Sequence, residues 1–332
     1  ELALTKARAD VARTLGATAG EVSFTGCGSE GNNLAILGAA RTRKWGKRIV
    51  CTDFEHPSVA LPMQRLAQEG YDVQFVAPEA DGHLNVDKML ELVDKNTILV
   101  AAMQVNNETG TAVDVARLAA GVKARNDRTA VHVDGVQAWM RVPVRLANID
   151  SYSVSGHKIH APKGIGAMYI RKGLKILPFI RGGGQEYRLR SGTEATAQIA
   201  GFAKAVELRL AGYEEKLARM AALKQYALEQ LLTIDGVVRI GNGDAPHILS
   251  VSLVGYPSAN VVTELGAQGI CISAGSACHR GKLSHVYAAM KLDKKTAAGV
   301  LRVSFAPETT KADIDALVSA LRRHRETRFP ML

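Results

Sequence analysis

A lysine that follows directly on a β-prone run is the first residue of this chain whose setting suits carbonyl chemistry. Lys158 ends the tetrapeptide Ser155-Gly-His-Lys158, just after the short run at residues 152–154. A lysine that is partly desolvated or close to other cations has a lowered pKa, which makes it a nucleophile toward carbonyl groups. Lys158 therefore fits a Schiff-base lysine, although an ordinary loop lysine could have the same neighbours in sequence.

An aspartate closes the preceding apolar run, Val131-His-Val-Asp134. At the end of a buried strand, an aspartate can cap a helix or form a turn. It can also pair with the pyridinium nitrogen of pyridoxal phosphate, which needs a nearby anion to act as an electron sink. An aspartate strand followed by a lysine strand is the order that such a cofactor site would use.

Two further segments combine a strand end with a polar residue. Gly26-Cys-Gly-Ser-Glu-Gly follows an apolar run and opens a predicted helix. Small residues at a helix start let backbone N–H groups approach an anion, so we place a cofactor phosphate on Gly28 and Ser29; a plain helix cap is the alternative. His56 follows the run at residues 48–52 and could either cap the next helix or take part in proton transfer.

One arginine lies among apolar residues near the end of the chain, in Val300-Leu-Arg302-Val-Ser-Phe. A charged side chain in such a setting needs a partner. A structural salt bridge would satisfy Arg302, and so would a substrate carboxylate, which suits a bidentate guanidinium.

The elements expected to position these residues alternate between strands and helices. A helix over residues 1–15 precedes seven β-prone runs, and the alternation of strands and helices predicts a mainly parallel sheet with its site at the carboxyl ends of the strands. The predicted strands of this α/β domain lie at residues 21–25, 48–52, 71–76, 97–103, 131–134 and 152–154, with another at 167–170. A long helical stretch over residues 194–232 leads to a smaller α+β domain, with strands near 237–240, 248–253 and 301–305.

Composition narrows the class of protein. With 332 residues, 47% hydrophobic and 5% aromatic, the chain suits a two-domain α/β protein, and no apolar run reaches the roughly 18 residues of a membrane span. The four cysteines form no CxxC pair, which argues against zinc and a disulfide framework and favours reduced cytoplasmic thiols. A net charge of +10 predicts acidic partners or substrates, but the basic clusters at 41–48 and 322–328 are typical of solvated helix faces, so we do not expect direct nucleic-acid binding.

A series of segments, in one order along the chain, resembles cysteine desulfurases, which belong to the class V aminotransferase-like, fold-type I pyridoxal-phosphate enzymes. Their shared order is far more specific than any single motif. The segments are Phe24-Thr-Gly-Cys-Gly-Ser-Glu-Gly-Asn-Asn, Glu55-His-Pro-Ser-Val, Val105-Asn-Asn-Glu-Thr-Gly, His132-Val-Asp-Gly-Val-Gln, Ser155-Gly-His-Lys, Gly182-Gly-Gly-Gln-Glu, Arg190-Ser-Gly-Thr-Glu and Ser273-Ala-Gly-Ser-Ala-Cys278.

The resemblance implies a role for each candidate around pyridoxal 5'-phosphate. Lys158 would hold the cofactor and move a proton, Asp134 would pair with the ring nitrogen, and His56 would lie over the ring. Gln137 would donate to the phenolic oxygen, and Asn107 would bond that oxygen or the substrate, although a turn asparagine is the alternative for Asn107.

The same resemblance completes the site. It implies that Ser155 and His157 bind the cofactor together with Gly28 and Ser29. It implies that Arg302 holds the substrate carboxylate. It also implies that Thr193 reaches the phosphate site of a partner subunit, which predicts a homodimer with shared sites.

Cys278 lies in a loop-like stretch, Gly275-Ser-Ala-Cys278-His-Arg-Gly-Lys282. Basic residues around a thiol favour the thiolate, which is the nucleophilic form. The resemblance implies that Cys278 takes sulfur from L-cysteine as a persulfide, with release of L-alanine. The sulfur would then pass to an acceptor such as an iron–sulfur scaffold or a tRNA-thiolation enzyme.

The predicted domains are a cofactor-binding large domain at residues 1–212 and a small domain at 213–332 that carries the cysteine loop. Family members carry an Asn-Ala-Ala-Thr-like motif ahead of their first matching segment, and residues 1–23 contain no such motif. Two other functions remain open at this point: a selenocysteine lyase or another class V enzyme, which would not need Cys278, and a non-catalytic binding or scaffold protein with this fold.

Overall fold

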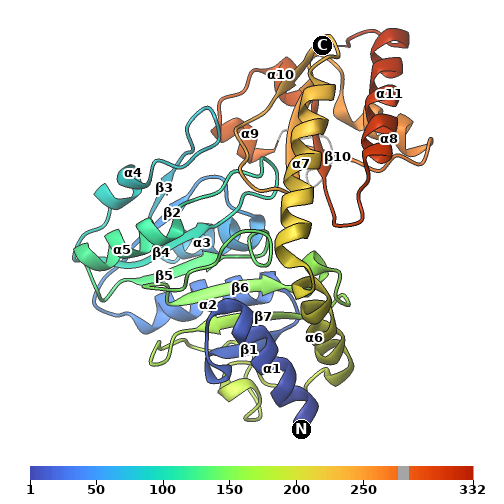
Figure 1. Cartoon of the computed structure of the whole chain (residues 1–332). Coiled ribbons are helices and arrows are strands. Elements are labelled where there is room, and N and C mark those ends of the chain that lie inside the picture. Colours follow the sequence, from blue (N-terminus) through green and yellow to red (C-terminus); the bar gives the residue numbers. More distant parts are fainter. Residues whose placement is uncertain (276–283, 332) are drawn as a thin grey trace. The chain divides into compact units, whose positions relative to one another are not determined.

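The chain folds into two compact units, and a computed structural model describes residues 1–275 and 284–331 (Figure 1). The first unit comprises Glu1–Val76, Asn85–Val105 and Val113–Ala211, and the second comprises Ala77–Leu84, Asn106–Ala112 and Gly212–Leu332. A single division after residue 212 would place the two short segments in the first unit. They join the second because their backbones bond to it: Asn242 N donates to Asp81 O at 2.8 Å, and Ala245 N donates to Gly110 O at 2.9 Å.

The first unit is built on a seven-stranded sheet with the order β1-β7-β6-β5-β4-β2-β3. Strand β7 pairs antiparallel with both β1 and β6, while the other neighbouring strands pair in parallel, so the expectation of a mainly parallel α/β sheet is confirmed. The strands are β1 (Val22–Thr25), β2 (Arg48–Thr52), β3 (Asp72–Val76), β4 (Thr97–Met103), β5 (Ala130–Asp134), β6 (Ser151–Ser155) and β7 (Gly166–Ile170).

Helices cover this sheet, and every residue of β4, β5, β6 and β7 is buried, as expected for a sheet covered on both faces. Helix α2 lies against β4, β5, β6 and β7, while α1 packs on α6. The helices of the unit are α1 (Leu2–Leu15), α2 (Gly28–Thr42), α3 (Pro57–Gln68), α4 (Val86–Glu91), α5 (Val115–Arg125) and α6 (Thr196–Leu210), with short 3₁₀ turns at η1 (Ala19–Glu21), η2 (Gly156–Ile159) and η3 (Glu186–Arg188).

The predicted helical stretch over residues 194–232 is two helices rather than one. Helix α6 ends at Leu210 and α7 (Tyr213–Leu231) begins three residues later. Gly212 between them has φ 63°, in the left-handed region that glycine adopts without steric cost, and this conformation interrupts the helical path.

The second unit contains a four-stranded antiparallel sheet with the order β10-β11-β9-β8. A core of buried residues from α7, β9, α8, β11 and α11 packs on it. The strands are β8 (Val237–Arg239), β9 (Ile248–Leu253), β10 (Ser273–Ala274) and β11 (Val300–Ser304), and the further helices are α8 (Ser258–Gly266), α9 (His285–Ala289), α10 (Lys294–Ala298) and α11 (Lys311–Thr327). Within the described residues, no helix is both long and apolar enough to cross a membrane.

Candidate active site

The first unit brings most of the predicted cofactor residues to the carboxyl edge of its parallel strands. Strand β5 ends at Asp134, β6 ends at Ser155, and η2, which carries Lys158, follows β6 at once. Helix α2 begins at Gly28, and His56 follows β2. Ligand sites of open α/β sheets form at this edge, so the arrangement matches the predicted location.

Asp134 is a buried carboxyl group, 5% exposed, that accepts hydrogen bonds from neutral donors. Its Oδ1 accepts from Val136 N at 2.9 Å, and its Oδ2 accepts from Asn32 Nδ2 at 2.8 Å. Burial raises the pKa of Asp134, while the hydrogen bonds from Val136 and Asn32 act in the opposite direction. A buried anion whose bonded donors are neutral is a suitable neighbour for the protonated ring nitrogen of pyridoxal phosphate.

His56 is the N-cap of α3, since its Nδ1 accepts from Ser58 N at 3.1 Å. The capping alternative from the sequence is therefore correct. It does not exclude the cofactor role, because the cap engages Nδ1, whereas a cofactor ring would stack on the imidazole face.

The start of α2 lies close to the ends of β5 and β6. A Cβ atom built on Gly28 would lie 2.4 Å from Val136 Cγ2 and 3.5 Å from Ser155 Cβ, so only glycine allows this approach. The N-cap residue, Cys27, provides no side-chain cap, and Ser29 is exposed. The first turn of a 15-residue helix can thus present its N–H groups to a phosphate, as the residues Gly28 and Ser29 were expected to do.

Lys158 is half-buried, and its backbone is held by an arginine. Its carbonyl oxygen accepts from Arg141 Nη2, and Arg141 Nη1 donates to Gln137 Oε1 at 3.0 Å. Burial lowers the pKa of Arg141 to about 9, and the charge of Arg209 acts in the same direction. Arg141 therefore ties the backbone of Lys158 to the side chain of Gln137, and both residues are predicted to bind the cofactor.

His157 and Ser155 form a pair beside this lysine, with 2.9 Å between Ser155 Oγ and His157 Nδ1. Burial lowers the pKa of His157, and the charges of Lys158, Arg141 and Lys163 lower it further. His157 is therefore neutral at pH 7, and it remains a candidate hydrogen-bonding group for the cofactor.

Arg302 and Asn107 lie together in the second unit. Arg302 Nη1 donates to the Asn107 carbonyl at 2.9 Å, and Nη2 donates to Ser273 Oγ at 3.2 Å. Among the described residues, the two groups that Arg302 bonds, the Asn107 carbonyl and the Ser273 hydroxyl, are uncharged. The structure therefore gives no support to a structural salt bridge at Arg302. The positive charge of Arg302 is thus available for a carboxylate.

Sequence reasoning gave no role to Glu108, although it belongs to the same motif as Asn107. Glu108 Oε1 accepts from Ser284 Oγ at 2.9 Å, and Ser284 is the N-cap of α9.

Cys278, the predicted persulfide carrier, lies outside the described residues, and its role stays a prediction.

Glu55 is a second acidic group that the sequence did not single out, apart from its place in a motif. It is buried next to His56, and its Oε1 accepts from Thr52 Oγ1 and, at 2.7 Å, from Met103 N. Burial raises the pKa of Glu55 to about 8, with a smaller contribution from the charge of Asp134. Glu55 therefore holds its proton at neutral pH and ties the ends of β2 and β4 together.

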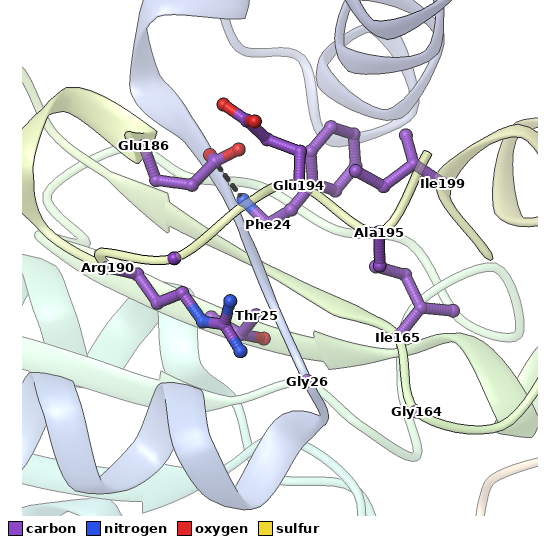
Figure 2. A pocket seen from close by; sticks show the side chains of 11 residues that line it. Phe24, Thr25, Gly26, Gly164, Ile165, Glu186, Arg190, Glu194, Ala195 and Ile199 are labelled. Atoms are coloured by element: carbon purple, nitrogen blue, oxygen red, sulfur yellow. Dashed lines mark hydrogen bonds between the residues drawn. The ribbon is translucent and has the colours of Figure 1, made fainter. Parts of the chain in front are cut away.

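A small pocket opens beside the end of β1 (Figure 2). It is lined by Phe24, Thr25 and Gly26, by Gly164 and Ile165, and by residues between Glu186 and Ile199. None of the predicted cofactor residues lines this pocket. Thr193 is exposed on the segment that forms one wall, and its role toward a partner subunit stays a prediction.

That wall has an unusual backbone. Glu186, Tyr187 and Arg188 all have positive φ angles, 48°, 56° and 66°, which are rare for residues other than glycine. The carboxylate of Glu186 holds the turn in place, because it accepts from Phe24 N at 2.8 Å (Figure 2). It also bonds both terminal nitrogens of Arg8, at 2.5 and 2.8 Å. The Arg8 and Glu186 side chains are only 14% and 3% exposed.

We expect Glu186→Ala to lower the free energy of unfolding by about 3–5 kcal/mol, because it leaves the Arg8 charge buried without its partner. The matched control is Asp87→Ala, which removes one member of the Arg117–Asp87 pair, 55% and 62% exposed, and is expected to cost about 1 kcal/mol or less. Urea unfolding of both variants measures the difference. Equal costs for the two variants would contradict the structural role given to Glu186.

Comparisons with known proteins identify the family of this chain. The family model described as Aminotransferase class-V matches residues 1–317. A cysteine desulfurase from Nostoc sp. (strain PCC 7120) is 38% identical over 96% of this chain and 81% of its own length. A cysteine desulfurase IscS from Dictyoglomus turgidum is 33% identical over 97% of this chain and 83% of its own length.

Solved structures give the same result. A NifS-like protein superposes with a TM-score of 0.92 at 34% identity, covering 98% of this chain and 88% of that one. The structure described as SspA in complex with cysteine has a TM-score of 0.80 at 30% identity, covering 93% and 88%. This chain therefore belongs to the class V aminotransferase family of pyridoxal-phosphate enzymes, and within that family to the cysteine desulfurases. Its cofactor is pyridoxal 5'-phosphate, and the family resemblance of the sequence is confirmed.

Proposed function

We propose that this chain removes sulfur from L-cysteine, releases L-alanine and carries the sulfur as a persulfide on Cys278 for transfer to an acceptor protein. The observation that carries the proposal is the cofactor cradle of the first unit, in a chain that belongs to the cysteine desulfurases. There, the buried Asp134 carboxylate, the N-cap His56 of α3, Gly28 at the start of α2 and the half-buried Lys158 gather at one sheet edge.

Asp134, Lys158 and Arg302 each have a definite task in the proposed reaction. When bound, pyridoxal phosphate supplies an electron sink for the pair released at the substrate Cα. Asp134 keeps a proton on the ring nitrogen, Lys158 Nζ holds the cofactor covalently and moves the Cα proton, and Arg302 binds the substrate carboxylate.

Sulfur transfer requires a thiolate, and Cys278 has the basic sequence neighbours that favour one. Its Sγ would form a bond to the substrate sulfur as the carbon–sulfur bond breaks. The electrons of the broken bond stay with the substrate carbon, which takes up a proton and leaves as alanine. The acceptor that then receives the sulfur would be an iron–sulfur scaffold or a tRNA-thiolation enzyme.

The proposal includes a homodimer in the cytoplasm, with Thr193 completing the phosphate site of the partner subunit. The segment before Thr193 exposes three large apolar side chains, Leu177, Phe179 and Ile180. Exposed apolar residues close together in the chain are typical of an interaction surface, and a second copy would cover them.

A product assay tests the proposed activity. The purified chain, loaded with pyridoxal phosphate, is given cysteine and a reductant, and sulfide and alanine are quantified. We expect equal amounts of the two products. Turnover only with selenocysteine would indicate a lyase, turnover only with a keto acid would indicate an aminotransferase, and cofactor binding without any turnover would indicate a non-catalytic protein.

A further inference from the structure

One buried amide joins the two groups that are expected to face the cofactor ring. Asn32 lies on α2 and is fully buried, at 0% exposure. Its Nδ2 lies 2.8 Å from Asp134 Oδ2 and 2.9 Å from Ser58 Oγ. An amide nitrogen carries two hydrogens, so one can go to Asp134 and the other to Ser58.

The second branch leads through Ser58 to His56. Because the Ser58 hydroxyl accepts from Asn32, its own hydrogen is available for His56 Nδ1, which lies 2.8 Å from Ser58 Oγ. The backbone N–H of Ser58 donates to the same ring nitrogen at 3.1 Å. A nitrogen that accepts from two donors carries no proton, so the neutral His56 ring has its proton on Nε2.

A second histidine lies against the oxygen end of the Asn32 amide. His132 Nε2 lies 3.0 Å from Asn32 Oδ1, and His132 Nδ1 lies 2.9 Å from Ser151 Oγ. Burial lowers the pKa of His132 to about 3, so the ring is neutral. Because Asn32 Oδ1 only accepts, His132 must carry its proton on Nε2 and receive the Ser151 hydrogen at Nδ1.

The opposite orientation of the amide is unfavourable on chemical grounds. It would place Asn32 Oδ1 against the Asp134 carboxylate and remove the side-chain donor to Asp134 Oδ2. A hydrogen bond to a carboxylate favours its ionised form, and burial opposes that form, so the lost bond would make Asp134 easier to protonate.

We propose that Asn32 is a positioning residue that sets the protons around the cofactor ring: it keeps Asp134 ionised and directed, and through Ser58 it keeps His56 in the neutral Nε2–H form. This inference rests on the proposed cofactor roles of Asp134 and His56. It does not rest on sulfur transfer, so its test can be separated from the product assay.

The first test is the tautomer of the two histidines in the full chain loaded with pyridoxal phosphate. Histidine ring ¹⁵N shifts from long-range ¹H–¹⁵N NMR distinguish a protonated ring nitrogen from an unprotonated one. We expect Nε2–H for both His56 and His132, and this measurement needs no variant. A proton on Nδ1 of His56 would overturn the proposal.

The second test separates the two branches by mutation. Asn32→Asp removes both donors and places a second carboxyl group against Asp134, so we expect the Kd for pyridoxal phosphate to rise at least about tenfold. Ser58→Ala removes only the hydroxyl link to His56 and is expected to change that Kd by less than about threefold while shifting the His56 ring ¹⁵N signals. If Asn32→Asp does not fold, Asn32→Ser, which keeps one donor, replaces it, with an expected rise in Kd of at least about threefold.

Unchanged cofactor affinity in the folded Asn32 variant would overturn the role of Asn32 toward Asp134. Unchanged His56 signals in Ser58→Ala would overturn the second branch. The cofactor Kd and the His56 ring ¹⁵N signals are both measured before any turnover. A chain that binds the cofactor but releases no sulfide would therefore contradict the proposed function, while these two measurements would still test the role of Asn32.

Discussion

Lys158→Ala is expected to abolish the covalent link to pyridoxal phosphate and to lower sulfide release by at least about 10³-fold. Two functions are lost together, since the amine both holds the cofactor and moves the Cα proton, and proton transfer by a positioned side chain alone contributes about 10²–10⁴-fold. The cradle that Asp134, Gly28 and the start of α2 provide does not depend on this amine. The variant should therefore still bind the cofactor without a covalent bond.

The measurement is borohydride reduction of the loaded protein followed by peptide mapping. In the wild-type chain the pyridoxyl group should be found on Lys158. Lys163, which is exposed five residues further on, gives the matched control. Lys163→Ala should keep the covalent link and sulfide release within about threefold, and a pyridoxyl group on Lys163 would contradict the assignment.

Asp134→Asn is expected to lower turnover by at least about 10³-fold, which corresponds to about 4 kcal/mol of activation free energy. The variant should keep its fold, because the amide oxygen can still accept from Val136 N. A neutral amide cannot hold a proton on the ring nitrogen, so the ring would lose most of its capacity to accept electrons.

The change at Asp134 needs a control at the same sheet edge. Asp53 follows β2 and is exposed, so Asp53→Asn removes one negative charge without touching the cradle. Its turnover should stay within about twofold of the wild type. Steady-state kinetics and urea unfolding of both variants decide the outcome, and a folded Asp134→Asn variant within tenfold of wild-type turnover would contradict the ring-nitrogen role.

The fold could be predicted from the sequence where the local pattern is strong. Residues 97–103 and 130–134 are apolar runs, and both are fully buried central strands. Residues 77–84 and 106–112 were missed as parts of the second unit, because local periodicity does not specify which body a connecting segment packs against. The break at Gly212 was missed for a similar reason, since the surrounding residues all favour a helix.

The sequence was enough to predict that Asp134 and Lys158 lie at the same edge of the sheet, because both follow parallel strands, and parallel strands bring their carboxyl ends together. The hydrogen-bond network around Asn32 could not be predicted from the sequence. Asn32 lies on α2 and its partners lie on α3 and β5, so these groups meet only in the folded chain. The one sequence feature that could have indicated this network is Asn32 itself, a polar residue on the buried face of the otherwise largely apolar helix α2. For His56, the sequence offered capping and cofactor contact as alternatives, and the structure shows the cap.

The location of the transferred sulfur tests the central claim most directly. Cys51 is buried, and burial raises the pKa of its thiol well above the ordinary value, so it is a poor acceptor. Cys271 is exposed and Cys27 is half-buried, so these two thiols are the competitors. The full chain loaded with pyridoxal phosphate is given one equivalent of cysteine without reductant, and its alkylated peptides are analysed by mass spectrometry. We expect one added sulfur on Cys278 and none on Cys271 or Cys27, with almost no sulfide released by Cys278→Ser. Sulfur on Cys271 or Cys27, or wild-type sulfide release by that variant, would contradict the role of Cys278.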